Sequence, residues 1–350
     1  MLHINKSLIS IQSPDFQPSL QLSATDARNE TKRNYYFYFS IYKYLCDQNS
    51  NFNILPRRIV RRISDIFSSI FTFNPVLEPS EFHFLQDEKI NSRFQVALYK
   101  GKKVAIKKFP QITDRDLKTF QEEAEECFYF QHPNVLKIVG HTNKKDNLQQ
   151  VYLATEKMES NLYDYLRATE PQPQQRLHIL SGIAQGLCYL HRFNFVHRRI
   201  RSRNILLDTQ LNPKLKSLGF NQLRSCSRTV NHFNQNKSQT VRYRAPEAFA
   251  RRYTPHPPAD IYGFGMIVWE TVVRRDPYMG KTEKEAYDLI EKGTKEVVPE
   301  NCPLYLKDLI HQCWAPSDTR LTSSEIVGKL RLIQTGEDNL EAHVPIKVRT

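Results

Sequence analysis

The first 100 residues of this 350-residue chain contain no glycine, and the first of its 11 glycines is Gly101. A glycine-rich turn, which lets backbone N–H groups approach a phosphate without a Cβ in the way, is therefore excluded from that stretch. Long apolar runs are also missing. No run of about 18 apolar residues occurs, so we expect no membrane-spanning helix. Residues 1–12 lack a basic start followed by a sustained apolar run, which argues against a secretory signal.

Closely spaced cysteine pairs are absent as well. The chain has six cysteines, and none of them forms a C-x-x-C pair. This scatter argues against both a disulfide framework and a zinc site. It predicts reduced thiols and a cytoplasmic location.

The charge that is present is basic and unevenly distributed. The net charge is +13, and residues 190–275 hold sixteen Lys and Arg against four Asp and Glu. The simplest interpretation is a solvated basic face. A sharper one is a surface for an acidic or phosphorylated partner, or weak contact with an anionic membrane. No nucleic-acid-binding motif accompanies the charge, so we expect no nucleic-acid partner.

The chain changes character near residue 87. Residues 1–86 form an N-terminal extension, with a polar and loosely ordered start at 1–33. Residues 56–73 place isoleucines at helical spacing and four arginines on other faces, which predicts a basic amphipathic helix. Such a helix packs on a neighbouring domain or lies on an anionic membrane, and we favour packing.

Residues 87–335 show short β-branched runs followed by long helical patterns. That order predicts an α+β domain with a sheet-rich part at about 87–157, a helical part at about 158–335 and a tail at 336–350. The segment Val104-Ala105-Ile106-Lys107 reads as a strand, and its alternation directs Lys107 to the inner face.

Several motifs follow one another in a fixed order. Glu123 lies in a predicted helix ahead of His132-Pro133-Asn134. Thr155, Glu156 and Met158 end a buried strand pattern. The later motifs are His197-Arg198-Arg199-Ile200-Arg201-Ser202-Arg203-Asn204, Lys214 to Phe220, Ala245-Pro246-Glu247, Asp260 to Gly265, and Cys313-Trp314 with Arg320. Over about 250 residues this order resembles the protein kinases, particularly the tyrosine-kinase-like group of serine/threonine kinases.

The resemblance implies a bilobal protein-kinase fold and a role for each matching residue. Lys107, paired with Glu123, would reach phosphates, Thr155 would be the gatekeeper, and Glu156 and Met158 would offer backbone groups to adenine. Asn204 matches a metal ligand of active kinases. The remaining matches are structural: His197, Arg198, Gly219, Asp260, and Glu247, which usually pairs with the late arginine, here Arg320.

The departures from the family fall on the chemistry. Arg199 stands at the position of the catalytic Asp, and an arginine stays protonated and cannot act as a base. Ser217 replaces the Asp that binds Mg²⁺. The glycine cradle is missing before Lys107. These three losses predict no metal site, and a nucleotide such as ATP, if bound, held without Mg²⁺.

We therefore expect a pseudokinase that acts as a scaffold or allosteric regulator in signalling. Its partners would be signalling proteins, such as another kinase or a phosphorylated or acidic protein. The wording around Arg199 and Gly219 also resembles, distantly, the mixed-lineage-kinase-domain-like pseudokinases. Two alternatives stay open: an active atypical serine/threonine kinase that uses another carboxylate, for example Asp208, and a kinase-like regulator of a membrane-binding segment at 56–73.

Overall fold

The structure is a computed structural model. It describes residues 76–91, 94–110, 130–142, 150–193, 195–216 and 241–336, together with Leu117, Phe120, Ala124, Cys127 and Phe128. The chain divides into two compact units, 1–71 and 72–350, and every described residue belongs to the second. The predicted loose segment 1–33, the predicted amphipathic helix 56–73 and the tail beyond Gly336 lie outside the described residues.

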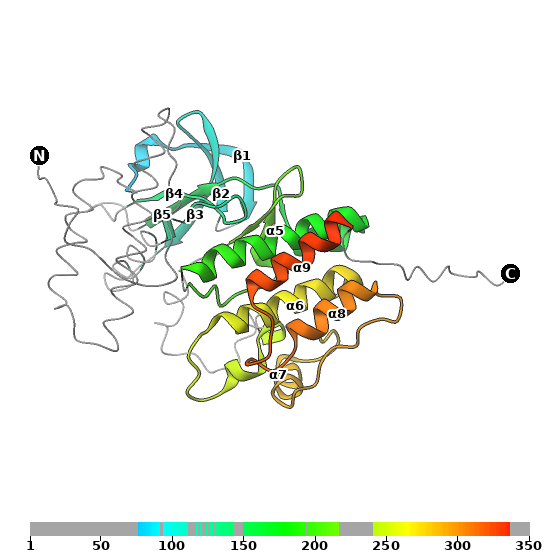
Figure 1. Cartoon of the computed structure of the whole chain (residues 1–350). Coiled ribbons are helices and arrows are strands. Elements are labelled where there is room, and N and C mark those ends of the chain that lie inside the picture. The colour runs from blue at the N-terminus through cyan, green and yellow to red at the C-terminus, as the bar shows by residue number, and fades with distance from the viewer. Residues whose placement is uncertain are drawn as a thin grey trace, which may run out of the picture. The chain divides into compact units, whose positions relative to one another are not determined.

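A five-stranded antiparallel sheet builds the small lobe, with the strand order β1-β2-β3-β5-β4 (Figure 1). Strand β3 pairs with β2 on one side and with β5 on the other. Its residues alternate between two faces: Val104 and Ile106 join one apolar core, and Lys107 lies on the opposite face, as predicted. The strands are β1 (His83–Asn91), β2 (Phe94–Tyr99), β3 (Lys102–Pro110), β4 (Ile138–His141) and β5 (Gln150–Glu156).

The small lobe includes residues that precede the expected start at residue 87. Strand β1 begins at His83, after a 3-10 turn, η2 (Pro79–Glu81). Leu77 and Phe82 are buried in the same core as Ile106, and the Leu77 amide donates to the His141 carbonyl at 2.7 Å. Burial of these two apolar side chains ties the segment before residue 87 to the sheet.

The helix expected to carry Glu123 is visible through single residues. The five described positions, from Leu117 to Phe128, all have helical backbone. Phe120, Ala124 and Cys127 are buried in the large apolar core, at the spacing expected for one helix face. Glu123 itself lies outside the described residues.

Helices build the large lobe, which follows the sheet in sequence (Figure 1). Helices α5 and α9 run side by side, as do α6 and α8, and the largest apolar core lies among them. The helices are α4 (Leu162–Ala168), α5 (Pro173–Arg192), α6 (Pro257–Val273), α7 (Glu283–Glu291), α8 (Leu304–Cys313) and α9 (Ser323–Thr335), with the 3-10 turns η3 (Ser202–Asn204) and η6 (Pro246–Phe249). A three-stranded sheet faces the small lobe: β6 (Ser160–Asn161), β7 (Ile205–Leu207) and β8 (Pro213–Leu215).

Two glycines let other segments approach α6 closely. A Cβ at Gly265 would lie 2.6 Å from the Cβ of Cys313 in α8. A Cβ at Gly263 would lie 3.1 Å from the carbonyl oxygen of Ile200. Because Gly265 has no Cβ, α8 can pack directly against α6. Because Gly263 has none, the loop around Ile200 can pack against the same helix, and this buried helix therefore positions the loop that carries Arg199. The observed architecture confirms the predicted α+β bilobal fold.

Candidate functional site between the two lobes

A cavity of about 320 Å³ lies between the small-lobe sheet and the sheet β6-β7-β8. This volume is at the lower end of the range for small-molecule sites. One part of its wall is apolar and is formed by side chains from both sheets. These residues are Ala105, Leu136, Ile138, Leu153, Leu206 and Leu215.

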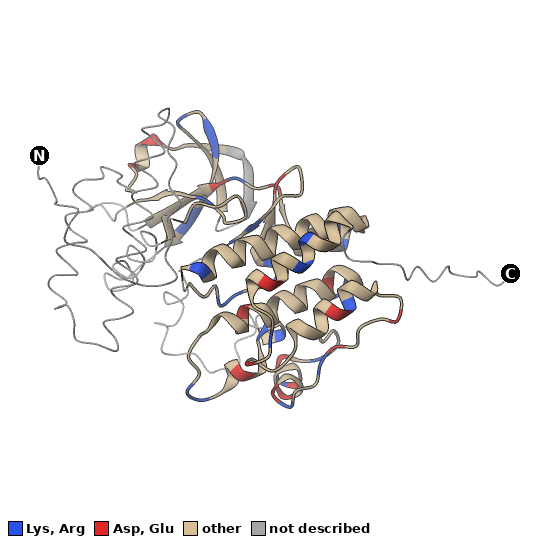
Figure 2. Cartoon of the chain, in the orientation of Figure 1, with Lys and Arg blue, Asp and Glu red and all other residues tan. Residues whose placement is uncertain are grey.

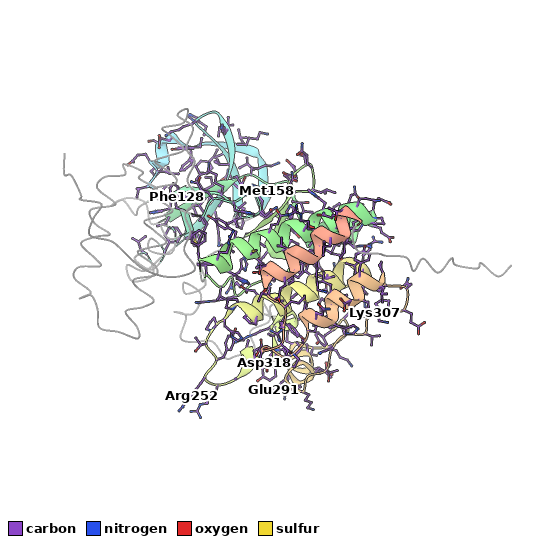
Figure 3. The ribbon with its side chains drawn as sticks, in the orientation of Figure 1. Phe128, Met158, Arg252, Glu291, Lys307 and Asp318 are labelled. Atoms are coloured by element: carbon purple, nitrogen blue, oxygen red, sulfur yellow. The ribbon has the colours of Figure 1, made fainter. Side chains whose placement is uncertain are left out.

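Thr155, Glu156 and Met158 line the cavity where the chain passes from β5 towards the large lobe. Met158 is labelled at this passage in Figure 3. The Glu156 side chain already accepts from the Lys137 amide at 2.7 Å and pairs with Lys214 at 3.1 Å. The backbone of Met158 makes no hydrogen bond within the described residues. The Met158 main chain is therefore available to form hydrogen bonds with the edge of a heteroaromatic ligand.

Lys107 also lines the cavity, and two aromatic rings lie close to its ammonium group. Its Nζ lies 4.6 Å from the ring centroid of Phe109 and 5.9 Å from that of Phe94. A second lysine, Lys216, lies on the other side of the cavity, with Nζ 4.9 Å from the same Phe94 ring. The sequence reasoning missed Phe94 and Lys216.

Asp260 holds the loop that resembles a catalytic loop. Its Oδ2 accepts from the His197 amide and its Oδ1 from the Arg198 amide, both at 2.7 Å. Its Oδ2 also contacts Nε2 of His191 at 3.1 Å. Arg198 has φ of 65°, a left-handed conformation that is uncommon for a residue with a side chain. The buried carboxylate of Asp260 therefore fixes a backbone that the sequence alone would not favour.

The backbone of Arg199 is fixed from both sides. Its amide donates to Nδ1 of His197 at 3.3 Å, and its carbonyl accepts from Nδ2 of Asn204 at 2.8 Å. The Lys216 amide in turn donates to the Asn204 carbonyl at 2.8 Å. Asn204 is buried and does not line the cavity. The loop is thus held in a defined conformation with an arginine at the position of the base.

His197 is fully buried, which favours its neutral form. Burial lowers its pKa, and this outweighs the opposite influence of Asp260. The hydrogen bonds define the tautomer, because Nδ1 accepts from the Arg199 amide and Nε2 donates to the Lys216 carbonyl at 2.8 Å. This single ring therefore links the Arg199 loop to the segment that enters Ser217.

A magnesium site finds no support in the part of the chain that the structure describes. Within it, no three His, Cys, Asp or Glu side chains gather closely enough to hold a metal ion. Asp208 makes hydrogen bonds in the β7–β8 turn. Its carboxylate accepts from the amides of Gln210 and Asn212 and from the Asn212 side chain, all at 2.8–2.9 Å. Although partial burial raises its pKa, these hydrogen bonds lower it on balance. Ser217 and Gly219 lie outside the described residues.

Glu247 and Arg320 form a two-point ion pair. The Nη1–Oε1 distance is 2.6 Å and the Nη2–Oε2 distance is 3.2 Å. Arg320 also donates to the carbonyls of Pro258 and Ala315. The pair joins η6 to the start of α6 and to the segment before α9, so it has an architectural role outside the cavity.

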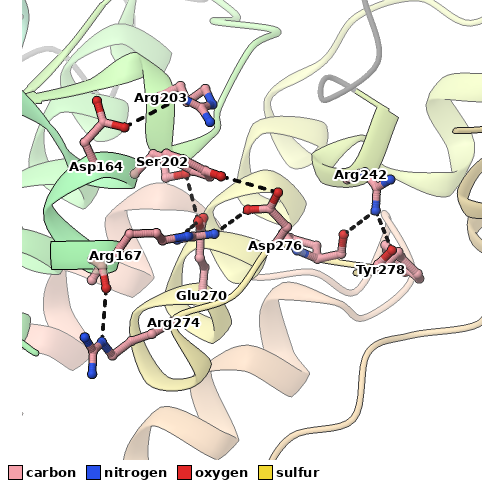
Figure 4. A network of polar contacts seen from close by, with 12 residues as sticks. Asp164, Arg167, Ser202, Arg203, Arg242, Glu270, Arg274, Asp276 and Tyr278 are labelled. Atoms are coloured by element: carbon pink, nitrogen blue, oxygen red, sulfur yellow. Dashed lines mark hydrogen bonds and ion pairs between the residues drawn. The ribbon is translucent and has the colours of Figure 1, made fainter. Parts of the chain in front are cut away.

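A second buried carboxylate, Glu270 of α6, lies at the centre of a polar network (Figure 4). Its Oε1 accepts from Arg167 Nη1 at 2.7 Å and from Ser202 Oγ at 3.0 Å, and its Oε2 accepts from the Tyr243 hydroxyl at 2.7 Å. Arg167 also pairs with Asp276. Burial raises the pKa of Glu270, against the influence of Tyr243 and Arg167. The network ties α4, the loop after Arg199 and the chain after residue 240 to α6.

The basic stretch 190–275 is partly neutralised in space. Figure 2 shows basic and acidic residues interspersed along the ribbon of the large lobe. Five of its cations pair with acids from outside the stretch: Lys214–Glu156, Arg203–Asp164, Arg274–Glu170, Arg242–Glu283 and Arg275–Glu296. The local excess seen in the sequence is therefore smaller in the folded lobe.

Comparison with known proteins agrees with this geometry. A family model described as protein tyrosine and serine/threonine kinase matches residues 92–330. The chain belongs to the protein kinase superfamily. Its relatives support the tyrosine-kinase-like group, and the predicted family is thereby confirmed. The match begins within the β1–β2 region and ends in α9, so it covers both lobes of this kinase domain.

Individual relatives match the domain at moderate identity. Human ephrin type-A receptor 1 is 34% identical over 200 residues, which cover 56% of this chain and 20% of the receptor. Human ephrin type-A receptor 5 is 27% identical over 302 residues, or 84% of this chain and 28% of the receptor. A serine/threonine-protein kinase/receptor-like protein of Acanthamoeba polyphaga mimivirus is 31% identical over 243 residues, or 66% of this chain and 14% of that protein. The chain spans less than a third of the length of these relatives.

Phe94 and Lys216 are two cavity residues to which the motifs assign no role. Phe94 lies directly opposite Lys107 in the β2–β3 register, and Lys216 directly precedes Ser217. The available signal for Phe94 was the β2–β3 register, because the Lys100-Gly101 turn pairs Tyr99 with Lys102 and so places Phe94 opposite Lys107. No helix in the described part of the chain has the length and apolar character to cross a bilayer.

Proposed function

We propose that this kinase domain is a pseudokinase that acts by binding, as a scaffold or allosteric regulator in signalling. One observation carries the proposal: Arg199 occupies the position of the base in a loop whose backbone is held by Asp260, His197 and Asn204. The loop keeps its backbone hydrogen bonds but has no catalytic base. An arginine cannot accept the proton of a substrate hydroxyl, and loss of a general base typically costs about 10²–10⁴ in rate.

The residues of the cleft suit a nucleotide that binds without a metal ion. Apolar side chains and the Met158 main chain suit an adenine ring, and the described residues offer no cluster of metal ligands. The residues thus fit adenine and do not fit Mg²⁺. We infer that ATP would bind through its base, without help from magnesium.

A thermal-shift assay tests the nucleotide part of the proposal. ATP with EDTA should raise the melting temperature, because a ligand that binds only the native state stabilises it. Adding Mg²⁺ in place of EDTA should give no further rise. Absence of any shift with ATP would remove this part of the proposal, and a clear additional shift with Mg²⁺ would contradict it.

The proposed partners are signalling proteins, among them another kinase or a phosphorylated or acidic protein, in the cytoplasm. Arg198 supports this choice, because it is exposed beside the fixed loop and could contact an anionic group. Affinity capture with the wild-type chain and with Arg198→Glu would test it. Partners that bind both forms equally would not be using this surface.

A further inference from the structure

Three arginines around the 3-10 turn η6 make no ion pair within the part of the chain that the structure describes. Arg244 precedes this turn, and Arg251 and Arg252 follow it. All three residues are exposed, and Figure 3 shows Arg252 projecting away from the helices. We call these three residues the η6 arginines.

Arginines elsewhere in the same part of the large lobe are mostly paired with acids. Residues 241–336 contain eight arginines, and four of them form ion pairs: Arg242, Arg274, Arg275 and Arg320. Among the other four, three are the η6 arginines, and the last is Arg331 of α9. Arginine side chains without an ion pair therefore gather at one place on the described surface.

Arg244 is held in place by contacts that do not neutralise its charge. Its guanidinium donates to the Ala248 carbonyl, and its Cζ lies 4.9 Å from the ring centroid of Phe249. The Phe249 ring in turn meets the ring of Tyr287 of α7 edge-on at 4.7 Å. Partial burial lowers the pKa of Arg244, and the groups that oppose this effect are tyrosines rather than carboxylates. Such a fixed cation is preorganised for an anion from outside the described residues.

Three acids of the neighbouring elements η6 and α7 already have partners. The contacts are Glu247 with Arg320, Glu283 with Arg242, and Glu291 with the Tyr287 hydroxyl. Because these carboxylates are engaged elsewhere, they do not form ion pairs with the η6 arginines. The positive charge of the three side chains therefore stays available to a partner.

We propose that the η6 arginines form a docking surface for a phosphorylated segment of a protein partner. Arg244 supplies a fixed guanidinium, whose planar fork of N–H groups matches two phosphate oxygens. Arg251 and Arg252 add two exposed cations on the following turn. A phosphorylated side chain carries about two negative charges on three acceptor oxygens, so it suits three guanidinium groups better than a single carboxylate does. The inference rests on the proposed class of partner and assigns the surface that binds it.

The test measures how much purified full chain is retained by arrays of short degenerate peptides. The fixed central residue of each set is phosphoserine, phosphotyrosine, Glu or Ser. The wild type should bind the phosphorylated sets about tenfold more than the Ser set, because hydrogen bonds between two charged groups are the strong ones. Arg244→Gln, and the double variant Arg251→Gln with Arg252→Gln, should each lose most of that difference. Arg244→Lys keeps the charge without the fork and should recover only part of it.

Arg331→Gln is the matched control. Arg331 is also exposed and makes no ion pair within the described residues, but it lies on α9. The variant removes one positive charge, as Arg244→Gln does, and phosphopeptide binding should stay within about twofold of the wild type because distant exposed charges are screened by salt. The melting temperature of the Arg251→Gln, Arg252→Gln variant should match that of the wild type, so that a loss of binding cannot come from unfolding.

Several outcomes would overturn the inference. Full phosphopeptide binding by both η6 variants would do so and leave the proposed class of partner intact, with Arg198→Glu then testing the other surface. An equal loss in Arg331→Gln would attribute binding to net charge. Binding of the wild type to phosphatidylserine vesicles, lost in the η6 variants and without phosphopeptide binding, would assign the surface to lipid. If the wild type binds the phosphorylated sets no better than the Ser set, the inference and the proposed phosphorylated partner fail together.

Discussion

In the large lobe, the carboxylates of Glu247, Asp260 and Glu270 each accept hydrogen bonds from two or more donors. At the positions that carry kinase chemistry, Arg199 stands in place of the base, and Lys107 and Lys216 of the cleft lie close to the ring of Phe94. The two regions belong to one kinase domain, yet acidic residues have been kept in one and replaced in the other. The comparison indicates that the carboxylates that stabilise a kinase fold are different residues from those that serve as base and metal ligands.

The physical reason lies in what each carboxylate holds. Removing a buried acceptor leaves its donors without partners inside the protein, which lowers stability at once. A base or metal ligand in the cleft is needed only when substrate and metal bind. We therefore expect its loss to impair catalysis without unfolding the domain. Substitutions in the two regions should separate stability from chemistry.

The largest expected effect is that of Asp260→Ala. The change leaves the buried amides of His197 and Arg198 without their acceptor and frees a left-handed backbone. We expect the free energy of unfolding to fall by about 3 kcal/mol, measured by urea denaturation. Asp260→Asn keeps one carbonyl acceptor and should lose less. A loss below about 1 kcal/mol for Asp260→Ala would contradict the architectural role of this residue.

Tyr243→Phe should have a smaller effect on the Glu270 network. The Tyr243 hydroxyl lies 2.7 Å from Glu270, and its removal leaves a fully buried carboxylate with one donor fewer. We expect a loss of about 1–2 kcal/mol in the same assay. The matched control is Tyr163→Phe, because its hydroxyl lies 3.5 Å from Asp276 and is only partly buried. Equal losses in the two variants would show that Glu270 does not depend on Tyr243.

The histidines predict a fall in stability as the pH is lowered. Burial lowers the pKa of His141, as it does for His197 and His132, so the unfolded chain takes up protons near the ordinary pKa of 6.5 that the folded chain does not. The free energy of unfolding should therefore decrease from pH 7.5 to 5.5, where a falling pH protonates the unfolded histidines first.

His141→Phe isolates one of these groups. Neither ring nitrogen of His141 has a hydrogen-bond partner among the described residues, and its ring meets Phe120 edge-on at 5.7 Å. The variant should gain about 1 kcal/mol at neutral pH and lose less on acidification than the wild type. A steeper pH dependence in the variant would contradict this assignment. The raised pKa of Glu270 affects the pH dependence of the wild type and of the variant equally, so the difference between the two proteins reports on His141.

The smallest expected effect is that of Arg199→Asp on phosphate transfer. The variant restores a carboxylate at the position of the base, but Ser217 still replaces the metal-binding Asp. We therefore expect no phosphate transfer from ATP with Mg²⁺, measured by mass spectrometry on the purified variant. Transfer by Arg199→Asp would show that Arg199 alone accounts for the missing activity.

The motifs predicted the fold and family because they record the contacts that hold the lobes. Glu247 and Arg320, or His197 and Asp260, are far apart in sequence and meet in space. The cleft was only partly predictable. Lys107, Thr155, Glu156 and Met158 line it, as expected, whereas Asn204 is buried beneath the loop. Phe94 belongs to no motif, and Lys216 lies in the Lys214–Phe220 motif without an assigned role. Their meeting depends on how the two sheets face each other.

The charge prediction shows a further limit of sequence reasoning. Counting along the chain made residues 190–275 strongly basic, but Glu156, Glu170 and Glu296 lie elsewhere in the sequence and pair with that stretch. Long-range ion pairs are invisible to a local count. The start of the small lobe at Leu77 was missed for a similar reason, since its burial depends on a distant strand.

The most direct test of the central claim is phosphate transfer by the purified chain, supplied with ATP and Mg²⁺ or Mn²⁺ and compared with Lys107→Met. Incorporation into the chain itself and into added protein substrates would be followed by mass spectrometry. Our account predicts that the wild type does not exceed the Lys107→Met control with either metal. Transfer by the wild type that disappears in Lys107→Met would contradict it, because the cleft would then be catalytic despite Arg199.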